Sequence, residues 1–241
     1  MHVLQMNQIQ FSYGKGQPFI RDFSANIQKG EIVNLAGLNG AGKTTLIRLA
    51  ATLSTPSSGR CIYFDDPDLP LQQVRRRMGY ASQEVALYGD ETVLDNLRLF
   101  GGLYGLDKQA LNHRIMQLSE WLELADNLPV RVNQCSGGTR RKTHLAAAML
   151  HHPELLVLDE PTAGIDIKTA DVMMNSLRQL AQDGTAILCA AHSLDEMLTL
   201  TGRVMVLHKG EVAGTVELPS EPNKVSDALR QQLKTEIIQL L

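Results

Sequence analysis

The apolar residues of this chain follow two spacings, one typical of strands and one typical of helices. Val3–Phe11 alternates apolar and polar positions roughly as a strand does, and Phe19–Ile27 and Glu31–Ala36 predict two further strands. Lys43–Thr52 has the pattern of a helix, and Arg60–Phe64 that of a fourth strand. The first part of the chain is therefore predicted to be mostly strands, with one helix between them.

The middle of the chain changes to helical spacing. Thr92 is a candidate helix cap, with Asp95 three residues later in the position of a capping box. Apolar residues recur at steps of four, three and four on one predicted helix face: Leu111, Ile115, Leu118 and Leu122. With a further helix over Ser136–Leu150, residues 86–151 are predicted to form a helical insert.

The strand spacing then returns. Leu155–Leu158 is a short, wholly apolar run, of the kind buried on both faces of a parallel sheet. A helix is predicted over Thr169–Gln182 and a buried strand over Thr185–Ala191, and Val204–Leu207 and Glu211–Val216 flank a hairpin turn. In the tail, about 220–241, apolar residues at steps of four predict an amphipathic helix: Val225, Leu229, Leu233 and Ile237.

Composition narrows the function classes. The chain has 241 residues, 44% of them hydrophobic, and 23 basic against 26 acidic residues, a net charge of -3 that gives no footprint for bulk nucleic-acid binding. The three cysteines are far apart, so they predict neither a metal site nor a disulfide framework. We expect no signal peptide at Met1–Asn7 and, without an 18-residue apolar stretch, no membrane span.

A glycine-rich loop is the strongest chemical signal. Gly37–Thr44 matches the pattern G-x-x-x-x-G-K-[ST], follows an apolar strand and opens a helix. Gly37, Gly40 and Gly42 allow turns in which backbone N–H groups face an anion, and the helix adds its positive end. Lys43 then reaches the outer phosphates of a nucleotide, the Thr44 hydroxyl ligates Mg²⁺, and Thr45 can add a phosphate contact.

Two carboxylates end the apolar strand at Leu155–Leu158. Because ligands bind at the carboxyl ends of strands in open α/β sheets, Asp159 is predicted to hold Mg²⁺ and Glu160 to act as general base on the attacking water. Taken alone, the pair could equally be acidic residues favoured by a helix dipole. The upstream phosphate loop favours the functional interpretation.

These motifs, together with Cys135–Thr139, make the chain resemble an ABC-type ATPase, the nucleotide-binding subunit of ABC transporters. The resemblance runs from about Val3 to Val216. Ser136, Gly137 and Gly138 match the family signature Leu-Ser-Gly-Gly-Gln, whereas Cys135 and Thr139 depart from it. Thr139 lacks the amide of glutamine, which would weaken contacts to the opposite nucleotide.

The resemblance implies roles for four further residues. Gln83 matches the glutamine that senses γ-phosphate and Mg²⁺, His192 the histidine that binds γ-phosphate, and Tyr13 the ring that stacks on adenine. Asp166 lies in the segment that resembles the dimer-contact loop. The expected catalytic residues are Lys43, Gln83, Glu160 and His192, and the expected Mg²⁺ ligands are Thr44, Gln83 and Asp159. The expected ATP contacts are Tyr13, Gly37, Asn39, Gly40, Ala41, Gly42, Lys43, Thr44, Thr45, Ser136, Gly137 and Gly138.

The family also implies a fold. It is an α/β P-loop NTPase with a RecA-like, mostly parallel sheet, an N-terminal antiparallel β subdomain and an inserted α-helical subdomain. For this chain the family fold implies one ATPase domain over residues 1–241. Its sheet core would be at about 1–85 and 152–216, its helical subdomain at about 86–151 and a helical tail at about 220–241.

The implied function is ATP-driven transport by a head-to-tail dimer, either homodimer or heterodimer, that sandwiches two ATP and drives a separate integral membrane permease. The subunit would be cytoplasmic, held at the inner face of the membrane by that permease, with no nucleic-acid partner. Gln83–Tyr88 and Leu97–Leu106 resemble the exporter-like branch that includes drug-, lipid- and haem-exporter ATPases. The alternative is a soluble ABC ATPase with soluble partners, as in iron–sulfur cluster assembly.

Overall fold

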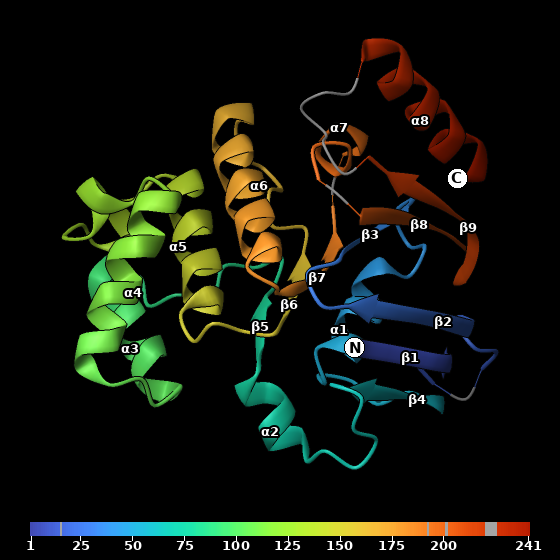
Figure 1. Ribbon diagram of the computed structural model, residues 1–241, viewed down its shortest axis with the longest axis horizontal. Helices are drawn as coiled ribbons and strands as arrows, with labels where there is room; N and C mark the ends of the chain where they lie inside the picture. The colour runs from blue at the N-terminus through green and yellow to red at the C-terminus, as the bar shows by residue number, and fades with distance from the viewer. Residues whose placement is uncertain (15, 192, 201, 220–225) are drawn as a thin grey trace.

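The computed structural model describes residues 1–14, 16–191, 193–200, 202–219 and 226–241 (Figure 1). The strands are β1 His2–Phe11, β2 Ile20–Gln28, β3 Ile32–Gly37, β4 Ser58–Tyr63, β5 Met78–Ala81, β6 Leu155–Asp159, β7 Ala186–Ala190, β8 Gly202–His208 and β9 Glu211–Leu218. The α-helices are α1 Lys43–Ala50, α2 Leu71–Arg76, α3 Val93–Leu103, α4 Lys108–Trp121, α5 Gly137–Met149, α6 Ile167–Gln182, α7 Leu194–Met197 and α8 Asp227–Leu240. Two 3₁₀ turns, η1 Ala125–Asn127 and η2 Val132–Gln134, precede α5.

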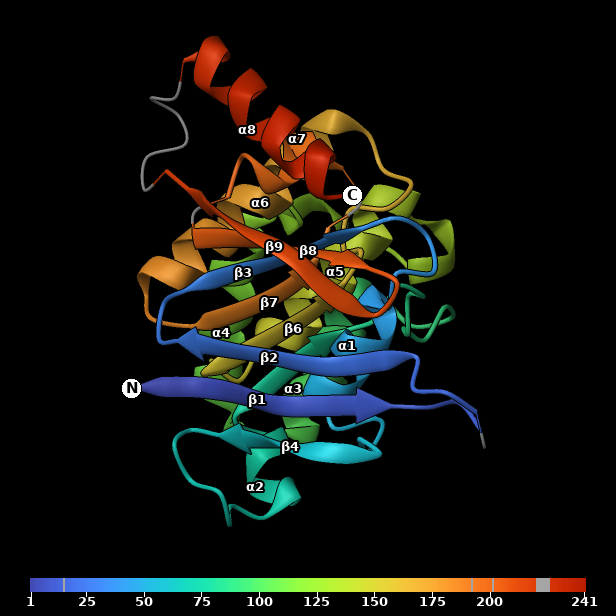
Figure 2. The same cartoon turned by 90° about the vertical axis from the view of Figure 1, so that its right-hand side faces the viewer.

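Two sheets form the core. A six-stranded sheet has the order β5-β6-β7-β3-β8-β9, parallel except for the β8–β9 hairpin, and a three-stranded antiparallel sheet has the order β2-β1-β4. Figure 2 shows the smaller sheet below the larger one, with α1 beside both. This arrangement confirms the predicted α/β fold with a mostly parallel sheet and an N-terminal antiparallel one.

The apolar strand β6 lies in the interior of the large sheet. It pairs in parallel with β5 and β7, and all five of its residues are buried. Leu156 and Leu158 pack with the helices on one face, while Leu155 and Val157 pack toward α1 and the small sheet. The unbroken apolar run therefore has the physical cause that the sequence predicted, burial on both faces.

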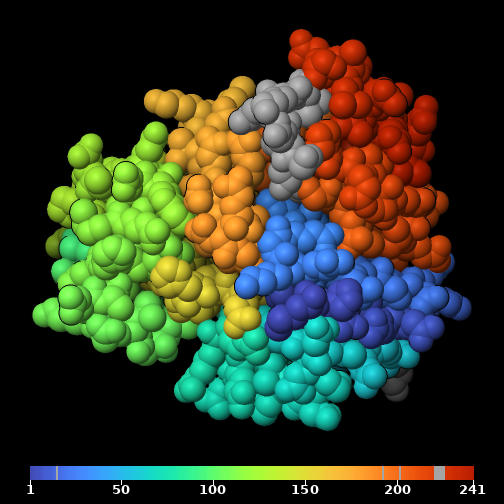
Figure 3. Space-filling view, viewed as in Figure 1, coloured from blue at the N-terminus to red at the C-terminus, as the bar shows by residue number. Residues whose placement is uncertain are grey.

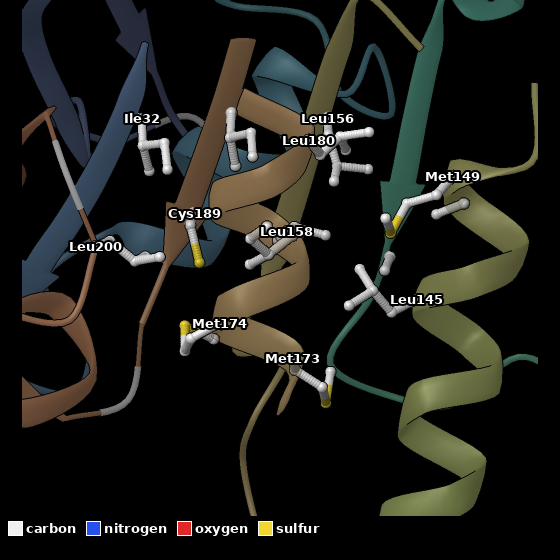
Figure 4. Packing of buried hydrophobic residues seen from close by; sticks show 14 of the residues in the cluster. Ile32, Leu145, Met149, Leu156, Leu158, Met173, Met174, Leu180, Cys189 and Leu200 are labelled. Carbon is white, nitrogen blue, oxygen red and sulfur yellow. The ribbon is translucent and has the colours of Figure 1, made fainter. Parts of the chain in front are cut away.

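Helices α3, α4 and α5 gather at one end of the molecule, drawn in green and yellow in Figure 3. Figure 4 shows Leu145 and Met149 of α5 facing Met173 of α6 and the strands behind it. The predicted cap of α3 is present, since the Asp95 N–H donates to the Thr92 hydroxyl oxygen at 3.0 Å. The helical spacing of this segment is thus confirmed, and α5 joins it to the core.

Two short elements that meet the start of β6 are absent from the sequence prediction, as is α7. The six-residue helix α2 and the four-residue strand β5 flank Arg77, whose guanidinium donates to both Glu154 oxygens, at 2.6 and 2.8 Å. This pair brings α2 and β5 to the start of β6. Both elements are too short to produce a periodic apolar pattern, and their partner is 77 residues away.

The tail forms α8, which packs on β8 and β9 (Figure 2). Leu233 and Ile237 are buried against the sheet, while Leu229 is exposed. The four-residue spacing of apolar positions in the tail therefore predicted the buried face correctly at Leu233 and Ile237, but not at Leu229. Val225 lies outside the described residues.

Candidate nucleotide site

The glycine-rich loop joins β3 to α1 at the carboxyl end of the large sheet. Gly42 caps α1 in a left-handed conformation, with φ 112°, and Gly40 is also left-handed, with φ 81°. The left-handed backbone favours glycine at position 42, and a Cβ atom there would also lie 2.6 Å from Ile20 Cδ1 and displace it. No side chain caps the first turn of α1 and no acidic residue lies in it. The helix end is therefore arranged to receive an anion.

Lys43 bends back over this loop. Its Nζ donates to the Gly37 carbonyl at 2.7 Å and to the Leu38 carbonyl at 3.4 Å. Gly37 itself is constrained by packing, because a Cβ atom there would lie 2.8 Å from the Leu207 carbonyl oxygen. The ammonium group is thus held on the same side of the loop as the pocket described below.

Tyr13 stands at the edge of the loop. Its hydroxyl lies 2.6 Å from the hydroxyl oxygen of Thr45, which is buried. The ring meets Phe11 edge-on at 5.0 Å between centroids and lies 5.5 Å from the ring of Phe19, yet it is 73% exposed. Tyr13 is therefore fixed by its hydroxyl and neighbours while a large part of its ring remains open for stacking.

Asp159 ends β6 beside the loop. Asp159 is 2% exposed, and its carboxylate accepts a hydrogen bond from the Thr44 hydroxyl at 3.2 Å. Burial raises the pKa of Asp159, and the hydrogen bond from Thr44 opposes that change. A buried carboxylate next to a hydroxyl is a donor set that suits Mg²⁺.

Glu160 follows in a strained conformation. Its backbone is left-handed, with φ 47°, although it is not glycine, and its N–H donates to the Ala190 carbonyl of β7 at 2.8 Å. Its carboxylate accepts a hydrogen bond from the Gln83 side-chain amide at 3.0 Å. The structure thus brings together two predicted site residues that are 77 positions apart.

One pocket of about 530 Å³ collects most of these groups. Its lining residues are Tyr13, Phe19, Asn39, Gly40, Gly42, Lys43, Thr44, Thr45, Gln83 and Glu160. Ala41 is buried in the loop, and Gly37 and Asp159 lie directly behind the lining through their contacts with Lys43 and Thr44. Phe19 is the one lining residue absent from the prediction, because the sequence pattern assigned it to a strand.

The signature residues lie elsewhere. Ser136 caps α5, accepting a hydrogen bond from the Thr139 N–H at 3.1 Å, and the two hydroxyl oxygens are 3.0 Å apart. Gly137 and Ala163–Ile165 line a second pocket, of about 440 Å³. Within the described part of the chain, no residue of 136–138 lines the pocket at the phosphate loop. A single chain therefore keeps the two predicted halves of the ATP site apart.

Two more predicted residues have different outcomes. Asp166 is exposed and caps α6, accepting hydrogen bonds from the Thr169 N–H at 3.0 Å and hydroxyl at 2.7 Å. His192 lies outside the described residues. Asp166 therefore has a structural partner within its own chain, and a dimer contact by this residue stays a prediction.

Arg141 is a site neighbour that the sequence did not reveal. Its guanidinium, on α5, donates to the Gln83 backbone carbonyl. Burial lowers the pKa of Arg141, and the nearby charge of Glu160 opposes that change. Nothing in the local sequence distinguishes Arg141 from a surface arginine, because its partners come from distant segments.

Comparisons with known proteins agree with these features. Residues 20–163 match the family model described as ABC transporter. The chain is 37% identical over 213 residues to the ABC transporter ATP-binding protein NatA of Bacillus subtilis (strain 168), covering 86% of each protein. It is 31% identical to the linearmycin resistance ATP-binding protein LnrL of the same organism, over 87% of this chain and 68% of that protein. With the Nod factor export ATP-binding protein I of Cupriavidus metallidurans it shares 33% identity, over 86% and 69%.

Solved structures give the same result. The chain superposes on a structure described as the ATP-binding subunit of an ABC transporter with a TM-score of 0.83 and 26% identity, covering 99% of each chain. A second, described as the dimeric structure of a bacterial ABC transporter cassette, has a TM-score of 0.80 and 25% identity, over 90% of this chain and 99% of that one. The fold is thus that of the P-loop NTPases. The chain belongs to the ABC transporter family, as an ABC-type ATPase subunit that binds and hydrolyses ATP for transport.

Proposed function

We propose that the pocket at the phosphate loop is the site of ATP hydrolysis. Lys43 and the loop N–H groups would hold the outer phosphates, and Tyr13 would stack on adenine. Glu160 would take a proton from the attacking water as general base, oriented by Gln83. One observation carries this assignment: the pocket that holds the phosphate loop also holds the hydrogen-bonded pair Gln83–Glu160.

We propose Mg²⁺ as the ion that accompanies ATP. Asp159, Thr44 and Gln83 would hold it, together with phosphate oxygens, and it would neutralise charge developing on the transferred phosphate. Among the described residues, no three His, Cys, Asp or Glu side chains form a metal cluster. A site with one buried carboxylate relies on the nucleotide for further oxygen ligands, so the metal and ATP would bind together.

We propose that the working unit is a head-to-tail dimer. Ser136–Gly138 of a second ATP-binding subunit would complete each site, so that ATP closes the dimer and hydrolysis opens it. The separation between this segment and the pocket in one chain supports the assembly. His192 would contact the γ-phosphate and Asp166 the second subunit, as the family resemblance implies.

We further propose that a separate permease forms the transport path. None of the helices that the structure describes combines the length and apolar character needed to cross a bilayer. The subunit would be cytoplasmic, at the inner face of the membrane, and residues 86–151 would act as the helical subdomain. Relatives named for Nod factor export and for linearmycin resistance favour an exporter over the soluble alternative in cluster assembly.

The decisive variant is Glu160→Gln. A glutamine keeps the size of the side chain and an oxygen that can accept from Gln83, but it cannot take a proton from water. We expect turnover of ATP to be abolished, while size-exclusion chromatography shows a dimer with ATP and a monomer with ADP. Hydrolysis at the parent rate would refute Glu160 as the general base.

A further inference from the structure

The strained turn at Glu160 is fastened to a second element. The Glu160 carbonyl accepts from the Ala163 N–H at 3.2 Å, so residues 160–163 form a tight turn. A left-handed, non-glycine conformation costs free energy and persists only where surrounding contacts enforce it. Its contact with the Ala190 carbonyl is one such constraint. A second lies two residues further along the turn.

That second constraint is Thr162. The residue is 3% exposed, and its hydroxyl donates to a Glu196 carboxylate oxygen at 2.7 Å. A hydrogen bond to a charged acceptor is stronger than one between neutral groups, and the partial burial of this bond limits its exchange for water. The turn that carries Glu160 is therefore tied to α7 through the Thr162–Glu196 bond.

Glu196 is itself held firmly. Its N–H donates to the Ser193 hydroxyl oxygen at 3.2 Å, and its carbonyl accepts from the Thr199 hydroxyl at 2.7 Å. On α7, Met197 is buried in the core. From the other side, Lys234 of α8 pairs with Asp195 at 2.5 Å. In Figure 1, α7 lies between α6 and α8, so its backbone is fixed on more than one side.

We propose that Glu196 is a positioning residue for hydrolysis, acting through Thr162 on the backbone of Glu160. Glu196 touches neither nucleotide phosphate nor water in this scheme. It keeps the 160–163 turn in the one conformation in which the Glu160 carboxylate meets Gln83. The inference rests on the proposed role of Glu160 as general base, because a displaced base transfers protons less efficiently even when ATP binds as before.

The test compares two buried threonines. Thr162→Val removes the hydroxyl and keeps the volume, whereas Thr162→Ser keeps the hydroxyl. Thr185→Val is the matched control, since the Thr185 hydroxyl is also buried and donates at 2.8 Å, to the Pro153 carbonyl at the far end of β7. The readouts are kcat and KM for ATP, with the thermal unfolding midpoint of each variant.

We expect Thr162→Val to lower kcat about tenfold or more without changing KM, since misplacing a catalytic group acts on the chemical step. Thr162→Ser should recover most of that loss. Thr185→Val should also lower the unfolding midpoint but leave kcat unchanged. Equal kcat values for Thr162→Val and Thr185→Val would overturn the proposal.

Variants of Glu196 test the other partner, and they decide the outcome if Thr162→Val does not fold. Glu196→Gln retains an oxygen that can accept from Thr162 and should stay active, whereas Glu196→Ala should lower kcat as Thr162→Val does. The double variant, Thr162→Val with Glu196→Ala, should lower kcat no more than either single substitution, because both remove the same contact. Activity of Glu196→Ala at the parent level would refute the inference.

The Glu160→Gln variant, measured in the same series, separates the two claims. If it is inactive while Thr162→Val and Glu196→Ala are fully active, the general base stands and the positioning role fails. If Glu160→Gln is active, the proposed function itself fails.

Discussion

Two hydroxyl groups at the start of α5 lie within hydrogen-bond distance of each other. Ser136 and Thr139 have their side-chain oxygens 3.0 Å apart, and the Thr139 N–H also donates to Ser136. In the proposed dimer Ser136 would face the partner's γ-phosphate. Thr139 therefore has two effects. It lacks the amide that would contact the nucleotide, and its hydroxyl occupies the serine that should contact the γ-phosphate.

From this contact we expect Thr139→Gln to raise ATP turnover a few-fold. The substitution removes the hydroxyl that contacts Ser136 and supplies an amide, while the hydrogen bond from the backbone N–H of residue 139 to Ser136 is retained. Thr139→Val, which only removes the hydroxyl, should give an intermediate rate. Steady-state ATPase assays test this, and a Thr139→Gln rate at or below the parent value would contradict it.

Lys43 offers a test of binding rather than chemistry. Its ammonium group lies over the loop carbonyls of Gly37 and Leu38 and would meet the outer phosphates of ATP. Lys43→Ala should weaken ATP binding about tenfold or more, the loss expected for a hydrogen bond to a charged group. Isothermal titration calorimetry measures this, with the exposed Lys108→Ala as control. Unchanged affinity of Lys43→Ala would count against the phosphate cradle.

At the scale of elements, α5 links the helical end of the molecule to the core. All residues from Lys142 to Met149 are buried, among them His144. Burial, with a smaller effect from the charge of Arg141, lowers the pKa of His144 to about 4 from its ordinary value of 6.5. Between about pH 4 and pH 6.5, the unfolded chain therefore binds a proton at His144 that the folded protein does not bind.

The stability of the protein should therefore depend on this histidine in mildly acidic solution. The stability that depends on a neutral His144 is fully present above pH 6.5 and is lost as the pH falls toward 4. The free energy of unfolding therefore decreases on acidification. Between about pH 7.5 and about pH 5, His144→Gln should lose about 2 kcal/mol less unfolding free energy than the parent protein. Urea titrations at both pH values test this. The exposed His113→Gln should behave like the parent, and identical losses for His144→Gln would contradict the argument.

The C-terminal helix gives a second prediction at this scale. Ile237 of α8 is fully buried on the sheet, while the neighbouring Ile238 is 57% exposed. Ile237→Ala should lower the unfolding free energy by about 2–4 kcal/mol, through lost burial and a cavity, and Ile238→Ala by less than about 1 kcal/mol. Chemical denaturation of the two variants measures the difference. Equal effects would show that α8 does not pack on β8 and β9 in solution.

For the whole molecule, the proposed dimer makes a prediction that one chain cannot. Gly137→Asp blocks the signature without disturbing the fold, because a Cβ atom there meets nothing within 4 Å. Lys43→Ala and Gly137→Asp should each be inactive alone. When the two variants are mixed, a heterodimer has one site in which an intact phosphate loop faces an intact signature segment. Because about half of the dimers are heterodimers and each has one active site of two, activity should return to roughly a quarter of the parent value. No recovery, with heterodimers demonstrated by pull-down of differently tagged chains, would contradict the head-to-tail arrangement.

The sequence by itself determined the local elements and the chemistry they carry. The pattern in β1 and the apolar run of β6 are visible in one dimension because the polarity of each position reflects the face that it occupies, and the cap at Thr92 joins residues only three positions apart. The loop Gly37–Thr44 is only partly local. The left-handed backbone of Gly40 and Gly42 is a local requirement, whereas Gly37 is also limited by Leu207, which is distant in the sequence.

The tertiary structure alone decided which distant residues meet. Gln83 reaches Glu160 across 77 positions, and Thr162 reaches Glu196 across 34, because parallel strands bring separate segments to one sheet edge. The short strand β5 and the left-handed backbone of Glu160 likewise exist only through such contacts. No periodicity encodes these pairings, since packing and hydrogen bonding between segments fix them only once the sheet has formed.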